Sequence, residues 1–140
     1  MPAEIRPFVE ADQAEVIALW RTCDLTRPWN DPAKDIARKL SVQRELFLVA
    51  SLEARIVATI MAGYDGHRGW INYLAVHPDH RRKGLGRRLM DDVQARLLGM
   101  GCPKINLQVR GTNRAALAFY EGIGFACDDA ISLGKRIIVD

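Results

Sequence analysis

The sequence predicts a mixed α/β domain of the α+β type, in which about four helices flank a mostly antiparallel sheet of about seven strands. Two observations carry this prediction. Three β-rich runs follow one another between positions 46 and 76 with only short turns between them, as consecutive antiparallel strands do. Apolar residues then recur at helical spacing between positions 85 and 100. Because the chain has 140 residues, we expect one domain spanning residues 1–140.

The first 45 residues predict a short strand followed by two helices. The strand is expected at Glu4–Phe8. Asp12 precedes the first helix and Glu15 follows three residues later, as in a capping box. The pair Asp31-Pro32 starts the second helix, with a capping residue followed by proline at the first helical position.

The central part of the chain predicts a hairpin and then a third strand. Residues 46–52 and 55–64 pair around the tight connection Glu53–Ala54, and the turn Asp65–Gly69 leads into strand 70–76. In that strand simple alternation places residues 70, 72, 74 and 76 on one face and residues 71, 73 and 75 on the other.

The last part of the chain predicts two helices and three strands. A long amphipathic helix begins at Leu85 and is ended by Gly101. We expect strand 104–109 next, and then a helix at 113–123 with Asn113 near its cap. Terminal strands are expected at 125–127 and 130–138.

Composition limits the class of protein. The apolar fraction of 49% suffices for a core, and a net charge of +3 does not demand a polyanionic partner. The three cysteines lack metal-ligand spacing, so we expect no metal. The N-terminus has no apolar core of a signal peptide, and no apolar run approaches the ~20 residues that cross a bilayer. These features predict a soluble cytoplasmic protein.

The basic turn HPDHRRKGLGRR, residues 77–88, is the strongest local motif. It contains R-x-x-G-x-G between a strand and a helix. Glycine lets the backbone approach a ligand closely, and a helix N-terminus offers unpaired N–H groups that suit phosphate. The alternative is an ordinary tight turn with solvated cations. The motif is neither a Walker A loop nor a dinucleotide fingerprint, which would need glycine where Leu89 stands.

A second motif makes the chain resemble a known family. The segment from Asn113 to Phe125 matches the pattern N-x-x-A-x-x-F-Y-x-x-x-G-F. Together with R-x-x-G-x-G and the order of elements, it resembles the GNAT family of acetyl-coenzyme A-dependent N-acyltransferases over essentially the whole chain. The segments RPWNDP, AGYDGHRG, GCPKI and SLGKR also resemble a small bacterial branch of that family named YpeA.

The resemblance implies acetyl-coenzyme A as co-substrate and an amine as acceptor. Backbone N–H groups of the basic turn would hold the coenzyme A diphosphate, the strand before it would pair with the pantetheine amides, and Asn113 would bind the cofactor arm. The cofactor-binding residues would be Leu74, Ala75, Val76, Arg81, Arg82, Lys83, Gly84, Leu85, Gly86, Arg87, Asn113 and Tyr120. The resemblance implies no nucleic-acid or membrane partner and leaves a homodimer open.

The resemblance also implies direct acyl transfer from a thioester to an amine in a ternary complex. A backbone N–H near Ala75 or Val76 would donate to the oxyanion, and Tyr120 would protonate the departing thiolate, although Tyr120 could instead be a core aromatic beside Phe119. Many relatives carry a glutamate base at the start of the fourth strand, where this chain has Trp70.

The general base is therefore sought near that strand. Asp65 is the first candidate, with His67 and Asp31 as others, and each residue also has a structural explanation as a turn or cap residue. Deprotonating a lysine amine at pH 7 costs about 4 to 5 kcal/mol, against about 1 kcal/mol for an α-amino group. The need for a base therefore depends on the acceptor.

The acceptor site is expected in the loop after the first helix. There Trp29, Asn30 and Asp31 would face Tyr64 and Asp65, although the loop could simply close on the core. A non-catalytic acyl-coenzyme A binder is the alternative function, supported by the missing carboxylate in strand 70–76. Nucleic-acid binding through Arg81–Arg88 is a distant third, since no aromatic residues interleave these arginines.

Overall fold

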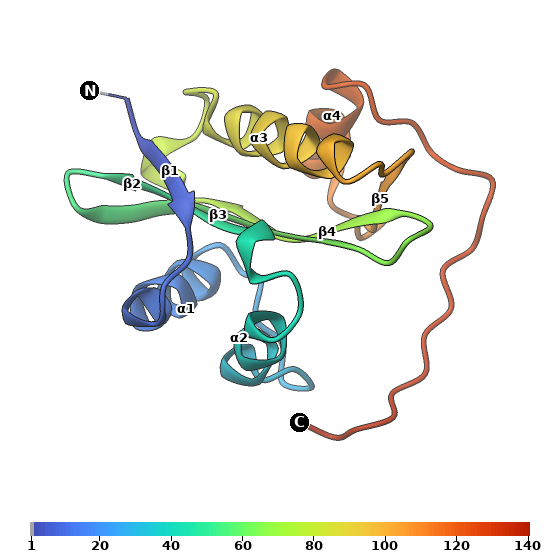
Figure 1. Ribbon diagram of the computed structural model, residues 1–140, viewed down its shortest axis with the longest axis horizontal. Coiled ribbons are helices and arrows are strands. Elements are labelled where there is room, and N and C mark those ends of the chain that lie inside the picture. The colour runs from blue at the N-terminus through green and yellow to red at the C-terminus, as the bar shows by residue number, and fades with distance from the viewer. Residues whose placement is uncertain (1) are drawn as a thin grey trace. The chain divides into compact units, whose positions relative to one another are not determined.

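The computed structural model describes residues 2–140, which divide into two compact units. One unit runs to Asn106 and includes Asp140; the other is Leu107–Val139. The helices and strands are labelled in Figure 1 and are β1 (Glu4–Pro7), α1 (Gln13–Thr22), α2 (Pro32–Leu40), β2 (Phe47–Leu52), β3 (Arg55–Tyr64), β4 (Gly69–Val76), α3 (Leu85–Gly99), β5 (Ile105–Leu107) and α4 (Arg114–Gly122).

The sheet confirms the predicted antiparallel core. Its strand order is β1-β2-β3-β4-β5, and the pairs β1–β2, β2–β3 and β3–β4 are all antiparallel. The β2–β3 hairpin closes through Glu53 and Ala54, whose φ angles of 52° and 63° are both left-handed. A two-residue type I′ turn needs this conformation at both positions, and here it is adopted without glycine.

Residues 2–140 form five strands, so the predicted count of about seven is too high by two. Residues 125–127 and 130–138 lie in no strand, and Ile131, Leu133 and Ile137 are about nine-tenths exposed. Alternating apolar residues indicate a strand only where a neighbouring backbone supplies the ladder of hydrogen bonds. Within residues 107–139 no such neighbour is paired with them.

The core of the first unit covers both faces of the sheet. Figure 1 shows α1 and α2 on one side and α3 on the other. The α1 side is built around Trp20 and Phe47, and α3 buries Leu89, Val93 and Leu97. Strands covered on both faces carry continuous apolar runs, which explains the compositions of β2 and β3.

A bulge in β4 changes which of its residues share a face. Thr59 pairs with Ala75 but Met61 pairs with Asn72, so two residues of β4 stand opposite one residue of β3. Ile71 pairs with Ala62, which is three residues from Thr59 on β3. Ile71 and Ala75 therefore lie on opposite faces, and the prediction that they share one is wrong because alternation does not continue through a bulge.

Helix α1 begins where predicted, but not by the predicted cap. The Asp12 carboxylate caps no N–H of α1 and instead accepts from the Val9 N–H at 2.9 Å. It also forms an ion pair with Arg6, with an N–O distance of 2.7 Å. Glu15 accepts from the Ile56 N–H at 3.1 Å rather than closing a capping box. The two carboxylates therefore fasten the start of α1 to its neighbouring strands.

Replacing Asp12 with asparagine is expected to lower the free energy of unfolding at pH 7 by about 1 to 3 kcal/mol. The hydrogen bond from Arg6 lowers the pKa of Asp12, so this stabilisation is complete above the unfolded-state pKa of about 3.9 and is lost as the pH falls through the lower folded-state value. Urea unfolding of both proteins at pH 7, 5 and 3.5 checks this. A stability difference that does not shrink at pH 3.5 would contradict it.

Candidate active site

The basic turn ends in an uncapped helix N-terminus. Gly84 precedes α3 with φ 78°, a left-handed conformation that favours glycine, and no side chain of residues 2–140 accepts from the first N–H groups of the helix. The first turn of α3 contains no acidic residue. Unpaired N–H groups with no competing carboxylate fit an anionic ligand such as a diphosphate.

The cations of this turn divide into two groups. Arg81, Arg82, Lys83 and Arg87 are exposed around the start of α3. Arg81 also donates from Nε to the Val76 carbonyl at 2.9 Å, which joins the turn to the end of β4. Arg88 belongs elsewhere, since its Nη2 donates to the Ala3 carbonyl at 2.9 Å. Its role is to hold the chain before β1 against α3.

The end of β4 that leads into this turn extends past its short neighbour. β5 has three residues and β4 has eight, and the Gly69 N–H donates to the Lys104 carbonyl at the beginning of β4. The opposite end carries Leu74, Ala75 and Val76. Ala75 is buried, whereas Leu74 and Val76 are half-buried. The predicted backbone donors thus lie directly before the basic turn in the chain.

Asn113 and Tyr120 both belong to the second unit, where Asn113 is the N-cap of α4 and Tyr120 lies within that helix. The Asn113 side chain caps α4 by accepting from the Ala116 N–H at 3.1 Å, as the sequence predicts. The Tyr120 ring makes edge-to-face contacts with Phe119 and Phe125. Burial raises the pKa of Tyr120 to about 12, so its hydroxyl is protonated at neutral pH.

Asp65 is engaged within the turn between β3 and β4. One carboxylate oxygen accepts from the N–H groups of His67 and Arg68 at 2.8 and 2.7 Å, and the other from the Trp70 indole at 3.3 Å. Bonds from the backbone of Arg68 and His67 lower the pKa of Asp65. Asp65 therefore stays ionised at neutral pH but is a weak base, and its assignment as the catalytic base stays a prediction.

The residues predicted to bind the acceptor make contacts in separate parts of the fold. Asp31 caps α2 by accepting from Ala33 N–H at 2.9 Å, while Tyr64 donates its hydroxyl to the carbonyls of Gly66 and Gly101 at 3.3 and 3.4 Å. Trp29 is 54% exposed and the Asn30 N–H donates to the Arg27 carbonyl. Their assignment to an acceptor site stays a prediction.

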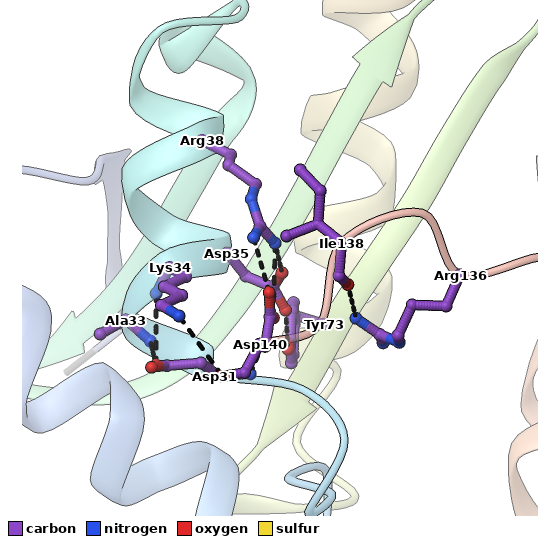
Figure 2. Close-up of polar contacts among 9 residues, drawn as sticks. All are labelled: Asp31, Ala33, Lys34, Asp35, Arg38, Tyr73, Arg136, Ile138 and Asp140. Atoms are coloured by element: carbon purple, nitrogen blue, oxygen red, sulfur yellow. Dashed lines mark hydrogen bonds and ion pairs between the residues drawn. The ribbon is translucent and has the colours of Figure 1, made fainter.

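A polar network that sequence reasoning missed connects α2 to β4 (Figure 2). The Tyr73 hydroxyl donates to Asp35 at 2.7 Å, and Arg38 contacts Asp35 at 3.3 Å. Arg38 also forms an ion pair with Asp140 at 2.6 Å, and Asp140 accepts from the Asp31 N–H at 3.0 Å. Asp35 and Tyr73 are 38 residues apart, and no local pattern in the sequence indicates the pair.

Among residues 2–140, no group of three or more His, Cys, Asp or Glu side chains could hold a metal ion. None of the helices that the structure describes is both long and apolar enough to span a bilayer.

Comparison with known proteins identifies the family. The model of the acetyltransferase (GNAT) family matches residues 14–125. An acetyltransferase of Yersinia enterocolitica is 51% identical over 137 residues, covering 98% of this chain and 97% of the relative. An acetyltransferase of Sodalis glossinidius is 51% identical over 138 residues with the same coverage.

Solved structures agree with this fold. The PaiA N-acetyltransferase of Thermoplasma acidophilum in complex with coenzyme A has a TM-score of 0.84 at 19% identity, over 94% of each chain. The ribosomal-protein-S18-alanine N-acetyltransferase of Escherichia coli has a TM-score of 0.72 at 25% identity, covering 87% of this chain and 76% of the other. With the sheet, the uncapped start of α3 and the sequence relatives in agreement, the chain is an acetyltransferase and belongs to the GNAT family.

Proposed function

We propose that this acetyltransferase transfers an acetyl group from acetyl-coenzyme A to a primary amine by direct attack in a ternary complex. One observation carries the proposal: the uncapped, glycine-started N-terminus of α3 follows the end of β4 after the basic turn of residues 77–84. An anion-binding turn next to a strand end with spare backbone groups suits a ligand that is a diphosphate at one end and an amide chain at the other.

Different residues are proposed to bind different parts of coenzyme A. The N–H groups of Leu85, Gly86 and Arg87 donate to the diphosphate oxygens at the positive end of the helix dipole, and the exposed cations of Arg82 and Lys83 add attraction. Arg81 has a further role, because its bond to the Val76 carbonyl fixes the turn relative to β4. Leu74 and Val76 supply backbone groups to the pantetheine arm.

The chemical step needs a hydrogen-bond donor to the oxyanion, an acid for the departing sulfur and a base for the attacking amine. The amine nitrogen attacks the thioester carbon, and a backbone N–H of Ala75 or Val76 donates to the developing oxyanion. The carbon–sulfur bond then breaks as Tyr120 gives its proton to the sulfur. The proton that leaves the amine passes to water or to Asp65.

Because Asp65 is a weak base, we expect the acceptor to be an amine of low pKa. Asp65 accepts three hydrogen bonds and its pKa is lowered, and β4 itself contains no carboxylate. An α-amino group is neutral far more often than a lysine side chain at pH 7. One structural neighbour is named as a ribosomal-protein-S18-alanine N-acetyltransferase, which supports testing the α-amines of alanine-bearing peptides first.

Coenzyme A and acetyl-coenzyme A are expected to raise the melting temperature, and ATP is not. A ligand at 100 times its Kd stabilises the folded state by about 2.7 kcal/mol. A thermal-shift titration with the three compounds measures this, and ATP controls for general attraction of phosphates to the cations. The absence of a shift with both coenzyme A compounds would overturn the proposal.

Thiol release separates catalysis from binding alone. Acetyl-coenzyme A is mixed with peptide α-amines, lysine-containing peptides and small diamines, and free thiol is followed over time. Release that depends on the amine supports acetyl transfer. Binding of acetyl-coenzyme A without release for any amine favours the non-catalytic acyl-coenzyme A binder.

A further inference from the structure

The β4 bulge contains a residue that the backbone alone disfavours. Tyr73 and Leu74 together stand opposite Ile60, and the φ angle of Tyr73 is 51°. A bulky residue other than glycine costs free energy in this left-handed region and persists only where its surroundings hold it. Such residues concentrate at active sites.

Three separate contacts hold Tyr73 in this conformation. Its ring stacks on Trp20 with centroids 3.7 Å apart and planes 9° from parallel. Its carbonyl accepts from the Thr59 hydroxyl at 2.9 Å. Its own hydroxyl donates to Asp35 at 2.7 Å, a contact that Figure 2 shows.

Thr59 is the centre of this arrangement. Its side chain is fully buried in β3, at the residue where the register shifts. The hydroxyl accepts from the Trp20 indole at 2.9 Å while it donates to the Tyr73 carbonyl. Successive hydrogen bonds therefore join Trp20, Thr59, Tyr73 and Asp35, and the Thr59 hydroxyl both accepts and donates.

The far end of this chain is also fixed. The Asp35 carboxylate forms an ion pair with Arg38, with an N–O distance of 3.3 Å, and Arg38 is also paired with Asp140. Burial raises the pKa of the Tyr73 hydroxyl well above its usual range, so it remains a donor to Asp35. Together these contacts join α1, β3, β4 and α2 around the β4 bulge.

We infer that Thr59 and Tyr73 are positioning residues for acetyl transfer. By holding the bulge, they turn the backbone N–H of Val76 away from β3 and toward the thioester carbonyl, while Ala75 pairs with Thr59 in the ladder. This rests on the proposed function, which places that carbonyl at β4. A regular strand that continued the register of Met61 and Asn72 would commit the Val76 N–H to the ladder with β3, and a relaxed bulge would leave its direction undefined.

The test follows the thioester carbonyl directly. Acetyl-coenzyme A labelled with carbon-13 at the carbonyl is bound to the protein, and its stretching frequency is measured by infrared difference spectroscopy. A directed N–H donor lowers this frequency relative to free acetyl-coenzyme A. This readout needs no acceptor amine.

Two substitutions at Thr59 form a matched pair. Thr59→Val keeps the shape and removes the hydroxyl, whereas Thr59→Ser keeps the hydroxyl. We expect Thr59→Val to return the carbonyl frequency toward the free value and to lower kcat about tenfold, with the KM for acetyl-coenzyme A changed less than about threefold. Thr59→Ser should restore both the frequency and the rate.

Two more variants guard against a loss of folding. Tyr73→Phe keeps the stack on Trp20 and removes only the bond to Asp35, so a smaller shift in the same direction is expected. Leu48→Val removes one methylene from the core on β2, two strands from β4, and should lower the melting temperature without moving the carbonyl band.

The outcomes separate this inference from the proposed function. A wild-type protein that binds no acetyl-coenzyme A overturns both. A wild-type carbonyl band that is lowered and stays lowered in Thr59→Val and Tyr73→Phe overturns only the inference. A band that moves equally in Leu48→Val also overturns it, because the effect would then follow stability alone.

Discussion

Replacing Gly84 with valine should weaken coenzyme A binding roughly a hundredfold. The φ angle of 78° is strained for any β-branched residue, and a Cβ at this position meets no protein atom within 4 Å. The new side chain would therefore stand in the open space before the α3 N-terminus, where the diphosphate is proposed to bind. Loss of two charge-assisted hydrogen bonds accounts for about 3 kcal/mol or more.

Gly101 provides a closely matched control at the other end of α3. Its φ angle is 85°, and a Cβ there also meets nothing within 4 Å. Gly101→Val should lose a similar stability of about 1 to 3 kcal/mol and keep its affinity for coenzyme A. Isothermal titration with coenzyme A measures both variants. Equal affinities in Gly84→Val and the wild type would remove the basic turn from the site.

Replacing Tyr120 with phenylalanine should lower kcat by roughly a hundredfold to a thousandfold, the range expected for loss of a general acid. The edge-to-face contacts with Phe119 and Phe125 depend on the ring and are kept. The melting temperature and the affinity for acetyl-coenzyme A should therefore hardly change. Steady-state thiol release with a saturating amine measures kcat, and a loss of less than about threefold would exclude Tyr120 as the acid.

The pH dependence gives a second check on Tyr120. Because burial raises its pKa to about 12, the hydroxyl stays protonated through the neutral and moderately alkaline range. The rate should accordingly rise with pH as the amine loses its proton and should show no decline from Tyr120 below about pH 10. A decline centred between pH 8 and 9 would contradict this assignment.

Features set by local chemistry could be predicted from the sequence. Asp31 before Pro32, Asn113 before α4 and Gly101 after α3 each mark a helix end in the structure, because capping needs only a few neighbouring residues. The two-residue connection at Glu53–Ala54 likewise followed from two β-rich runs with little between them. The turn before α3 also lies where its glycines indicated.

Features set by distant partners could not be predicted. Tyr73 adopts a left-handed conformation without glycine, and what holds it comes from Trp20, Thr59 and Asp35 on three other elements. Asp12 bonds with Arg6 and Val9 instead of capping α1, a choice between two local partners that the pattern leaves open. The strands expected at 125–127 and 130–138 depended on a neighbouring strand that alternation alone does not supply.

The strand order also sets how this sheet can fold. From β1 to β4, strands that are neighbours in the chain are neighbours in space, and the β2–β3 and β3–β4 connections span two and four residues. Contacts of such low sequence separation close quickly, since little chain entropy is lost before they form. The three central strands can therefore assemble while the segment after Asn106 is still being synthesised, and the strained Glu53–Ala54 turn lies at the hairpin where that assembly would begin.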